Sequence, residues 1–323
     1  MTEAPRALRL AILDDIHNAY AATAGVKRLK ERAERLHIFT GPFGPPQALA
    51  GFNAVIANRE RTRFDRALLA ALPDLRIIAQ TGNHAYHIDL AEAEARGIIV
   101  AKATGRFSRG AGELAIGLMI ALMRQIPASD RAVKDGVWRT PTTPVLNGKT
   151  LGIVGLGHVG GHVAKIAGTI GMRTLAWSPH LDPTRAATAG AEPAALDELL
   201  AASDIVSIHA TLTPQSRGLI DARRLSLMKP SAFLINTARG AIVDEAALVQ
   251  ALAAGRIAGA GLDVFTEEPL PRGHALTKLP NVILTPHLGW PTDQAYADFA
   301  AAAADALLAW LDGREVARFE SGH

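Results

Sequence analysis

The sequence predicts an α/β protein built from two doubly wound parallel-sheet domains. Apolar, strand-like runs alternate with helix-like runs through most of its 323 residues. Such alternation is typical of a parallel sheet covered by helices. The length corresponds to two domains of roughly 150 residues each. A composition of 49% hydrophobic and 20% charged residues fits a globular chain with a large core.

Composition also excludes several classes of function. The net charge is only +3, and no basic run is interleaved with aromatic residues, so we expect no nucleic-acid partner. The chain has no cysteine, which rules out disulfides and thiolate metal sites. The N-terminal sequence MTEAPRALRL lacks the apolar core of a signal peptide, and the longest apolar run, 114–123, is shorter than a membrane span. We therefore expect no membrane association and a cytoplasmic location.

The first hundred residues contain the elements of one sheet domain. Strands are predicted at 8–13, 54–58, 76–80 and 97–101, and helices at 64–72 and 89–97. The second of these helices reaches Gly97, a typical helix stop. A long apolar helix is predicted at 109–126, followed by a polar, proline-containing stretch at 136–150.

The second domain has the strand count of a doubly wound dinucleotide fold. Six strands are predicted within 150–155, 173–178, 204–210, 232–238, 257–265 and 282–287. The first domain would therefore extend to about residue 102 and the second from there to about residue 291. A long alanine-rich helix, 293–313, follows, and its periodicity does not say on which domain it packs.

A glycine-rich loop marks the cofactor site. Gly155, Gly157 and Gly160 form a G-x-G-x-x-G pattern between a predicted strand and a predicted helix. The first glycine permits the tight turn, the second lets the backbone approach a pyrophosphate, and the third lets the helix pack closely on the strand. The helix N-terminus then presents N–H groups to the phosphates. This pattern predicts a Rossmann dinucleotide-binding domain.

The residue expected to bind the adenosine ribose is unusual. An acid usually follows the glycine loop by about 20 residues, but here Ser178 ends the next strand. A serine can hydrogen-bond a ribose hydroxyl, and it does not repel a 2′-phosphate as a carboxylate would. His180 and Arg185 are the nearest side chains that could meet such a phosphate. We therefore expect NADP preference or dual specificity, with strict NAD preference as the alternative.

Three polar residues follow predicted strands and suggest acid–base chemistry. Arg239, Glu268 and His287 lie beyond strands of the second domain, and ligands of open parallel sheets bind outside the carboxyl ends of strands. Reduction of a 2-oxo acid requires a proton donor, and His287 suits that role. Glu268 would favour the protonated imidazole and orient its ring. Arg239 would bind the substrate carboxylate and carbonyl with its fork of N–H groups.

At this point the motifs identify a family. The chain resembles the D-isomer-specific 2-hydroxyacid dehydrogenases over nearly its whole length, through GLGHVG (155–160), HATLTPQSRGLI (209–220), LINTARGAIVDEAAL (234–248), GLDVFTEEPL (261–270) and TPHLG (285–289). The resemblance implies that Arg239, Glu268 and His287 are catalytic. It also implies that 292–323 returns to 1–102 to complete a flavodoxin-like substrate domain, while 103–291 binds the cofactor. A homodimer paired through the long apolar helix is expected on the same basis.

The resemblance further implies a set of binding residues. Asp263 would hold the nicotinamide carboxamide. The remaining expected cofactor contacts are the glycine loop with His158 and Val159, then Ser178, His209, Thr237 and Ala238. The substrate carboxylate would bind the loop formed by Thr81, Gly82, Asn83 and His84, together with Arg239. Here His84 stands where the family has a second glycine, and both Asn83 and His84 can adopt turns with positive φ. We expect this change to reshape the substrate pocket.

Several alternatives remain open from the sequence. His84 and His87 have an HxxH spacing, but no third ligand is evident and we expect no metal. Phosphite and D-3-phosphoglycerate are alternative substrates, although no basic pocket for a phosphate can be assigned. A different class of function is an NAD(H)-sensing interaction protein, since corepressors of this fold keep the catalytic residues. Turnover would separate an enzyme from such a binding protein.

Overall fold

The computed structural model describes residues 7–104 and 109–321. The chain forms two compact units, unit 1 from 1–108 and 291–323 and unit 2 from 109–290. Each unit contains one parallel sheet, which agrees with the predicted fold class. The first six residues, on which part of the signal-peptide argument depends, lie outside the described residues.

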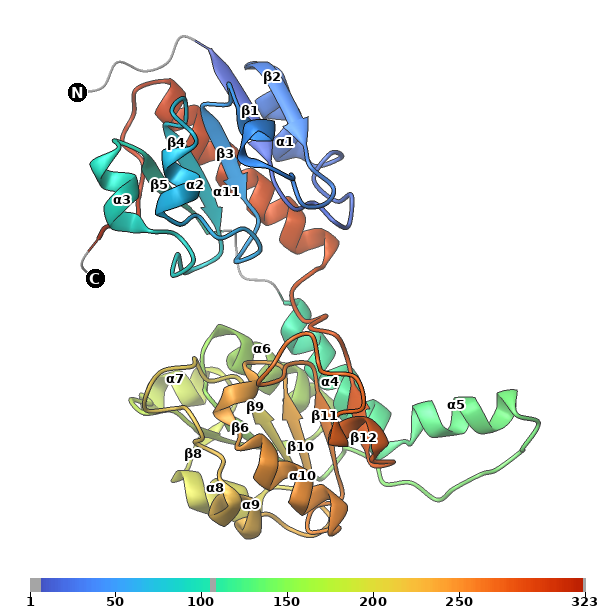
Figure 1. Cartoon of the computed structure of the whole chain (residues 1–323). Helices are drawn as coiled ribbons and strands as arrows, with labels where there is room; N and C mark the ends of the chain where they lie inside the picture. Colours follow the sequence, from blue (N-terminus) through green and yellow to red (C-terminus); the bar gives the residue numbers. More distant parts are fainter. Residues whose placement is uncertain (1–6, 105–108, 322–323) are drawn as a thin grey trace. The chain divides into compact units, whose positions relative to one another are not determined.

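Unit 1 has a five-stranded parallel sheet in the order β2-β1-β3-β4-β5 (Figure 1). Its strands are β1 (Leu8–Ile12), β2 (Ala33–Ile38), β3 (Ala54–Ala57), β4 (Ile77–Thr81) and β5 (Ile99–Ala103). Its helices are α1 (Ala24–Lys30), α2 (Arg66–Ala70), α3 (Leu90–Ala95), α11 (Asp293–Leu311) and the 3₁₀ helix η1 (Pro46–Leu49). The central strands β3 and β4 are buried along their whole length, as expected for parallel strands covered on both faces.

The sequence did not indicate α1 or β2, and the position of β2 explains part of this. β2 pairs only with β1, at one edge of the sheet. Every residue in it is exposed or partly exposed, and two of its six residues are charged. An edge strand of this kind has no continuous apolar run to recognise.

The helix whose packing the sequence left open belongs to unit 1. α11 packs on α1, β4 and β5 and buries Tyr296, Phe299 and Leu307. Its approach to α1 is close, because a Cβ atom on Gly25 would collide with the backbone of Ala300. A glycine at this position therefore lets the two helices meet.

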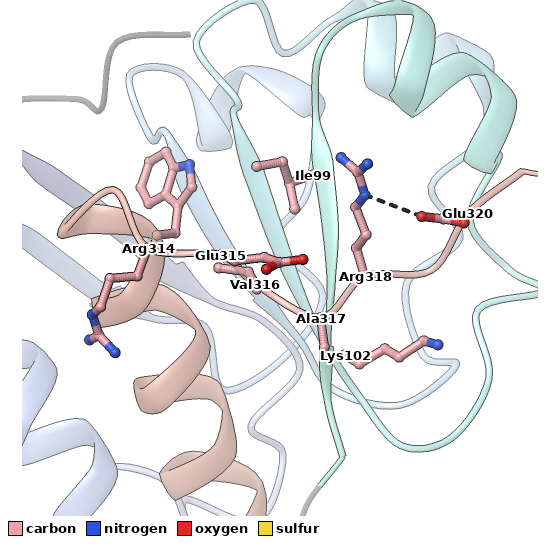
Figure 2. A pocket seen from close by; sticks show the side chains of 9 residues that line it. Ile99, Lys102, Arg314, Glu315, Val316, Ala317, Arg318 and Glu320 are labelled. Atoms are coloured by element: carbon pink, nitrogen blue, oxygen red, sulfur yellow. Dashed lines mark ion pairs between the residues drawn. The ribbon is translucent and has the colours of Figure 1, made fainter. Parts of the chain in front are cut away.

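The segment after α11 closes the outer edge of β5. The Lys102 N–H donates to the Ala317 carbonyl and the Phe319 N–H to the Val100 carbonyl, both at 2.8 Å. This antiparallel pairing covers a strand edge that would otherwise be free to pair with another chain. A pocket of about 490 Å³ lies between β5 and this segment, and none of the predicted site residues lines it (Figure 2).

Unit 2 has a seven-stranded parallel sheet in the order β12-β11-β10-β9-β6-β7-β8. Its strands are β6 (Thr150–Val154), β7 (Arg173–Trp177), β8 (Glu192–Pro193), β9 (Ile205–Ile208), β10 (Phe233–Asn236), β11 (Gly259–Leu262) and β12 (Val282–Leu284). Its helices are α4 (Gly110–Met123), α5 (Ile126–Lys134), α6 (His158–Ile170), α7 (Pro183–Thr188), α8 (Leu196–Ala202), α9 (Ala222–Leu227), α10 (Glu245–Ala253) and the 3₁₀ helices η2 (Gly240–Ile242) and η3 (Ala275–Lys278). All six predicted strands are present, and β8 is an additional two-residue strand.

The long helix predicted at 109–126 is two helices. α4 ends at Met123, and α5 begins at Ile126 after Gln125, whose φ of 52° is left-handed. Together α4 and α5 have the length and apolar composition of a span but are bent by 60°, and no single helix among the described residues has both properties. α4 is largely buried in unit 2, whereas α5 buries no residue and projects from the unit (Figure 1).

Candidate active site

The glycine loop lies between β6 and α6 and has the shape that the sequence predicts. Gly155 has a φ of 102°, and a Cβ atom there would collide with the backbone of Ala210. A Cβ atom on Gly160 would collide with the carbonyl oxygen of Gly155, so α6 can pack closely on the loop. Gly157 instead faces open space, and no side chain caps the N-terminus of α6. The loop and the uncapped helix end therefore fit a pyrophosphate.

A cavity of about 510 Å³ extends from this loop along the carboxyl edge of the unit 2 sheet. Ser178 and Arg185 line it, together with Gly155 and Gly157, whereas His180 is not among the lining residues. The Ser178 hydroxyl accepts a hydrogen bond of 2.8 Å from the Leu156 N–H. It therefore holds the glycine loop in place and keeps its own hydrogen free to donate to a ligand.

The other expected cofactor residues lie on neighbouring strand ends of unit 2. His209 lines the same cavity, and its Nε2 lies 2.9 Å from the Ser207 hydroxyl. Burial lowers the pKa of His209 to about 4, so the ring is neutral near pH 7. The Thr237 hydroxyl is buried and has no hydrogen-bond partner among the described residues. Val159, in contrast, packs against the hydrophobic core under α6.

Arg239 follows β10 in a tight turn. The buried Asn236 side chain brackets this turn, since it accepts from the Ala238 N–H and donates to the Arg239 carbonyl, both at 3.0 Å. A Cβ atom on Gly240 would collide with the backbone of Phe265, so glycine brings the turn against the loop that follows β11. Asn236 and Gly240 form the turn around the predicted arginine, although neither was among the predicted site residues.

Glu268 and His287 form a direct pair in unit 2. The His287 Nδ1 donates to the Glu268 carboxylate at 2.7 Å, and the other carboxylate oxygen accepts from the Phe265 N–H at 2.9 Å. Burial raises the pKa of Glu268, but these hydrogen bonds and the charge of Arg239 outweigh burial and lower it. The predicted catalytic residues are therefore brought together, with an ionised carboxylate behind the imidazole.

The loop that carries His287 is held by Asp263. The Asp263 carboxylate is fully buried, and it accepts hydrogen bonds from the Leu288 N–H at 2.7 Å and the Gly289 N–H at 2.9 Å. It also accepts from the Thr285 hydroxyl at 2.5 Å. His287 itself has a left-handed φ of 56°. Asp263 therefore stabilises the loop that carries His287, and its carboxylate is not exposed to solvent in this structure.

The expected substrate loop lies at the carboxyl edge of the unit 1 sheet. The fully buried Thr81 donates to the Ala57 carbonyl and accepts from the Arg59 N–H, so its hydroxyl joins two loops. Gly82 has a φ of 101°, and neither Asn83 nor His84 has a positive φ. Asn83 and His84 therefore do not use the positive φ that both residue types tolerate, and within this loop only Gly82 has one.

His84 and His87, which have the HxxH spacing, each contact another side chain of unit 1. His84 contacts Glu60, and the His87 Nε2 donates to the Gln80 side chain at 3.1 Å. Within 7–104 and 109–321, no three His, Asp or Glu residues are grouped so that they could hold a metal ion.

Comparison with known proteins identifies relatives for both units. Residues 116–289 match the model of the D-isomer specific 2-hydroxyacid dehydrogenase, NAD binding domain. A glyoxylate reductase of Thermococcus litoralis is 37% identical over 302 residues, which cover 90% of this chain and 91% of the relative.

A D-3-phosphoglycerate dehydrogenase of Mycobacterium tuberculosis is 41% identical over 240 residues, or 73% of this chain. The matched part is 45% of that relative, so the chain spans about half the length of some curated relatives. The crystal structure of a phosphoglycerate oxidoreductase from Vibrio cholerae has a TM-score of 0.83 and 30% identity, covering 95% of this chain and 99% of that one.

Proposed function

Because the chain belongs to the D-isomer specific 2-hydroxyacid dehydrogenase family, we propose that it transfers a hydride between a nicotinamide dinucleotide and a small 2-oxo or 2-hydroxy acid of D configuration. The observation that carries this proposal is the 2.7 Å pair of His287 and Glu268, which lies in the unit that also holds the glycine loop. Unit 2 would bind the cofactor and unit 1 the substrate.

In the reduction direction, His287 donates the proton. A nicotinamide dinucleotide bound at the glycine loop would supply the hydride for C2 of the 2-oxo acid, and the His287 imidazolium would give a proton to the carbonyl oxygen. Glu268 accepts the Nδ1–H, which leaves Nε2 to face the substrate and stabilises the charged ring. Arg239 binds the substrate carboxylate and polarises its carbonyl. The products are the D-2-hydroxy acid and a neutral imidazole, and oxidation reverses each transfer.

The backbone of the unit 1 loop supports its role as the carboxylate-binding segment. Within the described residues, the N–H groups of Asn83 and His84 donate to no acceptor. Two adjacent N–H groups of this kind suit a carboxylate. The side chain of Thr81 positions this loop and does not contact the substrate in this proposal.

We propose NADP preference or dual specificity for the cofactor site. Ser178 places no negative charge in the cavity, and Arg185 lines it. A 2′-phosphate would therefore meet a cation and a hydroxyl donor where a carboxylate would repel it.

Arg239→Lys tests the substrate site separately. An ammonium cannot reproduce the two-pronged hydrogen bonding of a guanidinium, so this variant should lose most of its turnover.

A homodimer is the proposed assembly. The two subunits were expected to pair through α4. Much of α4 is buried in unit 2, whereas the segment after it exposes large apolar side chains. Trp138 is 85% exposed, and Ile126, Val133, Val137 and Val145 are also exposed. We expect the segment 126–146 to pack on a second copy of the chain. Light scattering should give a dimer for the wild type and a smaller species for Trp138→Glu with Val133→Glu.

The direct test of the function is the initial rate of NADPH and NADH oxidation. The panel contains glyoxylate, hydroxypyruvate, pyruvate, phenylpyruvate and 2-oxoisocaproate. Turnover that is lost in His287→Gln, with cofactor binding unchanged, supports the proposal. Cofactor binding without turnover of any acid would refute it and favour an NAD(H)-sensing protein.

A further inference from the structure

Unit 1 carries an acid beside its expected substrate loop. We propose that Glu60 is a specificity-determining residue that selects 2-oxo acids with a neutral, hydroxyl-bearing substituent and disfavours phosphorylated ones. This inference rests on the proposed function, because it names the substrate class of that site. One relative is named for a phosphorylated acid and another for glyoxylate, which has no phosphate, and the inference concerns that difference.

Glu60 is placed by three donors around the loop. One carboxylate oxygen accepts from the His84 Nε2 at 3.2 Å and from the Tyr86 hydroxyl at 3.1 Å. The other accepts from the Arg59 Nε at 3.1 Å. The rings of His84 and Tyr86 stack with their centroids 4.6 Å apart. The carboxylate is therefore fixed in contact with the same residue, His84, whose N–H we assign to the substrate carboxylate.

A buried amide makes this arrangement rigid. The fully buried Gln80 side chain donates to the carbonyl groups of Arg59, Thr81 and His84 at 3.2, 2.8 and 3.2 Å. These bonds join the loop after β3, which carries Glu60, to the loop after β4. The Arg59 side chain also lies beside Gly82, since a Cβ atom on that glycine would be 3.5 Å from the Arg59 Cδ.

The charges of Glu60 and Arg59 offset each other at this edge. Burial raises the pKa of Glu60, but the His84 hydrogen bond and the Arg59 charge hold it well below its usual range. Glu60 is therefore an anion near neutral pH, and its carboxylate lies 3.1 Å from the Arg59 Nε. A phosphate bound beside Arg59 would meet this negative charge as well.

The consequence for a substrate follows from charge and hydrogen bonding. A phosphoryl group carries about −1.5 to −2 charges near neutral pH and would be repelled by Glu60. Across a partly solvated edge, such repulsion corresponds to about one to two orders of magnitude in affinity. A neutral hydroxyl can instead donate to the Glu60 carboxylate.

The experiment compares two substrates that differ only by the phosphate. We would measure kcat/KM of the full chain for hydroxypyruvate and 3-phosphohydroxypyruvate, with glyoxylate as a reference without substituent. The wild type should prefer hydroxypyruvate by at least about tenfold. Glu60→Gln keeps the size of the side chain and removes the charge, and it should reduce this preference at least about fivefold, mainly through KM. Glu34→Gln, an exposed residue on β2, removes the same charge from unit 1 and should leave the preference unchanged.

Direct binding separates this inference from the proposed function. Calorimetric titration with D-glycerate and D-3-phosphoglycerate, in the presence of NADP⁺, should show the same preference without requiring turnover. A protein that discriminates in binding but reduces no acid would refute the proposed function and keep the inference. Equal or tighter binding of D-3-phosphoglycerate by the wild type overturns the inference, whether or not Glu60→Gln folds.

Discussion

Replacement of Asp263 by asparagine tests what this buried acid does. The structure gives its carboxylate three donors from the 285–289 loop, whereas the family resemblance assigns it to the nicotinamide. Asparagine retains one side-chain oxygen, which can still accept hydrogen bonds from the Thr285 hydroxyl and the Leu288 N–H. Its NH₂ group would then face the Gly289 N–H, donor against donor.

The expected magnitude follows from these contacts. Loss of one hydrogen bond to a charged acceptor and burial of an unsatisfied N–H together lower the free energy of unfolding by about 3 kcal/mol. For a unit of this size, that corresponds to a fall in Tm of roughly 6–12 °C. Since the same loop carries His287, kcat should fall as well, while the affinity for the cofactor changes little.

The assay combines thermal unfolding, cofactor titration and steady-state kinetics on Asp263→Asn. Glu198→Gln is the control, because it removes one negative charge from an exposed position in the same unit. If the Tm were unchanged and only the affinity for the cofactor fell strongly, the reasoning would be refuted. Asp263 would then be assigned to nicotinamide binding.

Four further predictions address the same sites. Glu268→Gln keeps an acceptor for the His287 Nδ1–H but removes the carboxylate charge that stabilises the protonated ring, so kcat for reduction should fall while cofactor affinity stays unchanged; an unchanged kcat would exclude this role of Glu268. His287→Gln should lower kcat by a factor of about 10²–10⁴ and retain the affinity for the cofactor. A smaller decrease would mean that another group donates the proton. Ser178→Asp should weaken the binding of NADPH at least about tenfold relative to that of NADH. Equal effects on the binding of both cofactors would exclude Ser178 from the ribose site. The pKa of His209 is about 4 in the folded protein and about 6.5 in the unfolded chain. Protonation of this ring therefore favours the unfolded state, and the free energy of unfolding should decrease as the pH falls from 6.5 to 4. Urea unfolding at pH 7 and pH 5 should therefore show a smaller loss of stability for His209→Gln than for the wild type.

The sequence predicted the elements whose patterns are local. Gly155, Gly157 and Gly160 occur in a fixed spacing, and the apolar runs before Arg239 and His287 indicate the strands that carry them. The carboxyl ends of parallel strands meet at one edge, so proximity of these residues followed from the fold class. The 2.7 Å contact of Glu268 and His287 agrees with that reasoning.

Features that depend on tertiary contacts could not be predicted in this way. β2 has no apolar run because its residues are exposed. The end of α4 depends on the left-handed Gln125, a residue type that does not favour that conformation. The three donors of Glu60 come from its own loop and from the loop after β4, and no spacing in the sequence indicates that Glu60 and His84 meet.

The composition of unit 1 from two segments sets an order for its folding during synthesis. Unit 2 is continuous in the sequence, whereas α11 follows it and belongs to unit 1. A ribosome therefore completes every strand of both sheets before it makes the helix that packs on β4 and β5. Until α11 emerges, the face that Phe299 and Leu307 cover remains without its helix. Nascent unit 1 would thus present an apolar sheet to chaperones during translation of more than half of the chain.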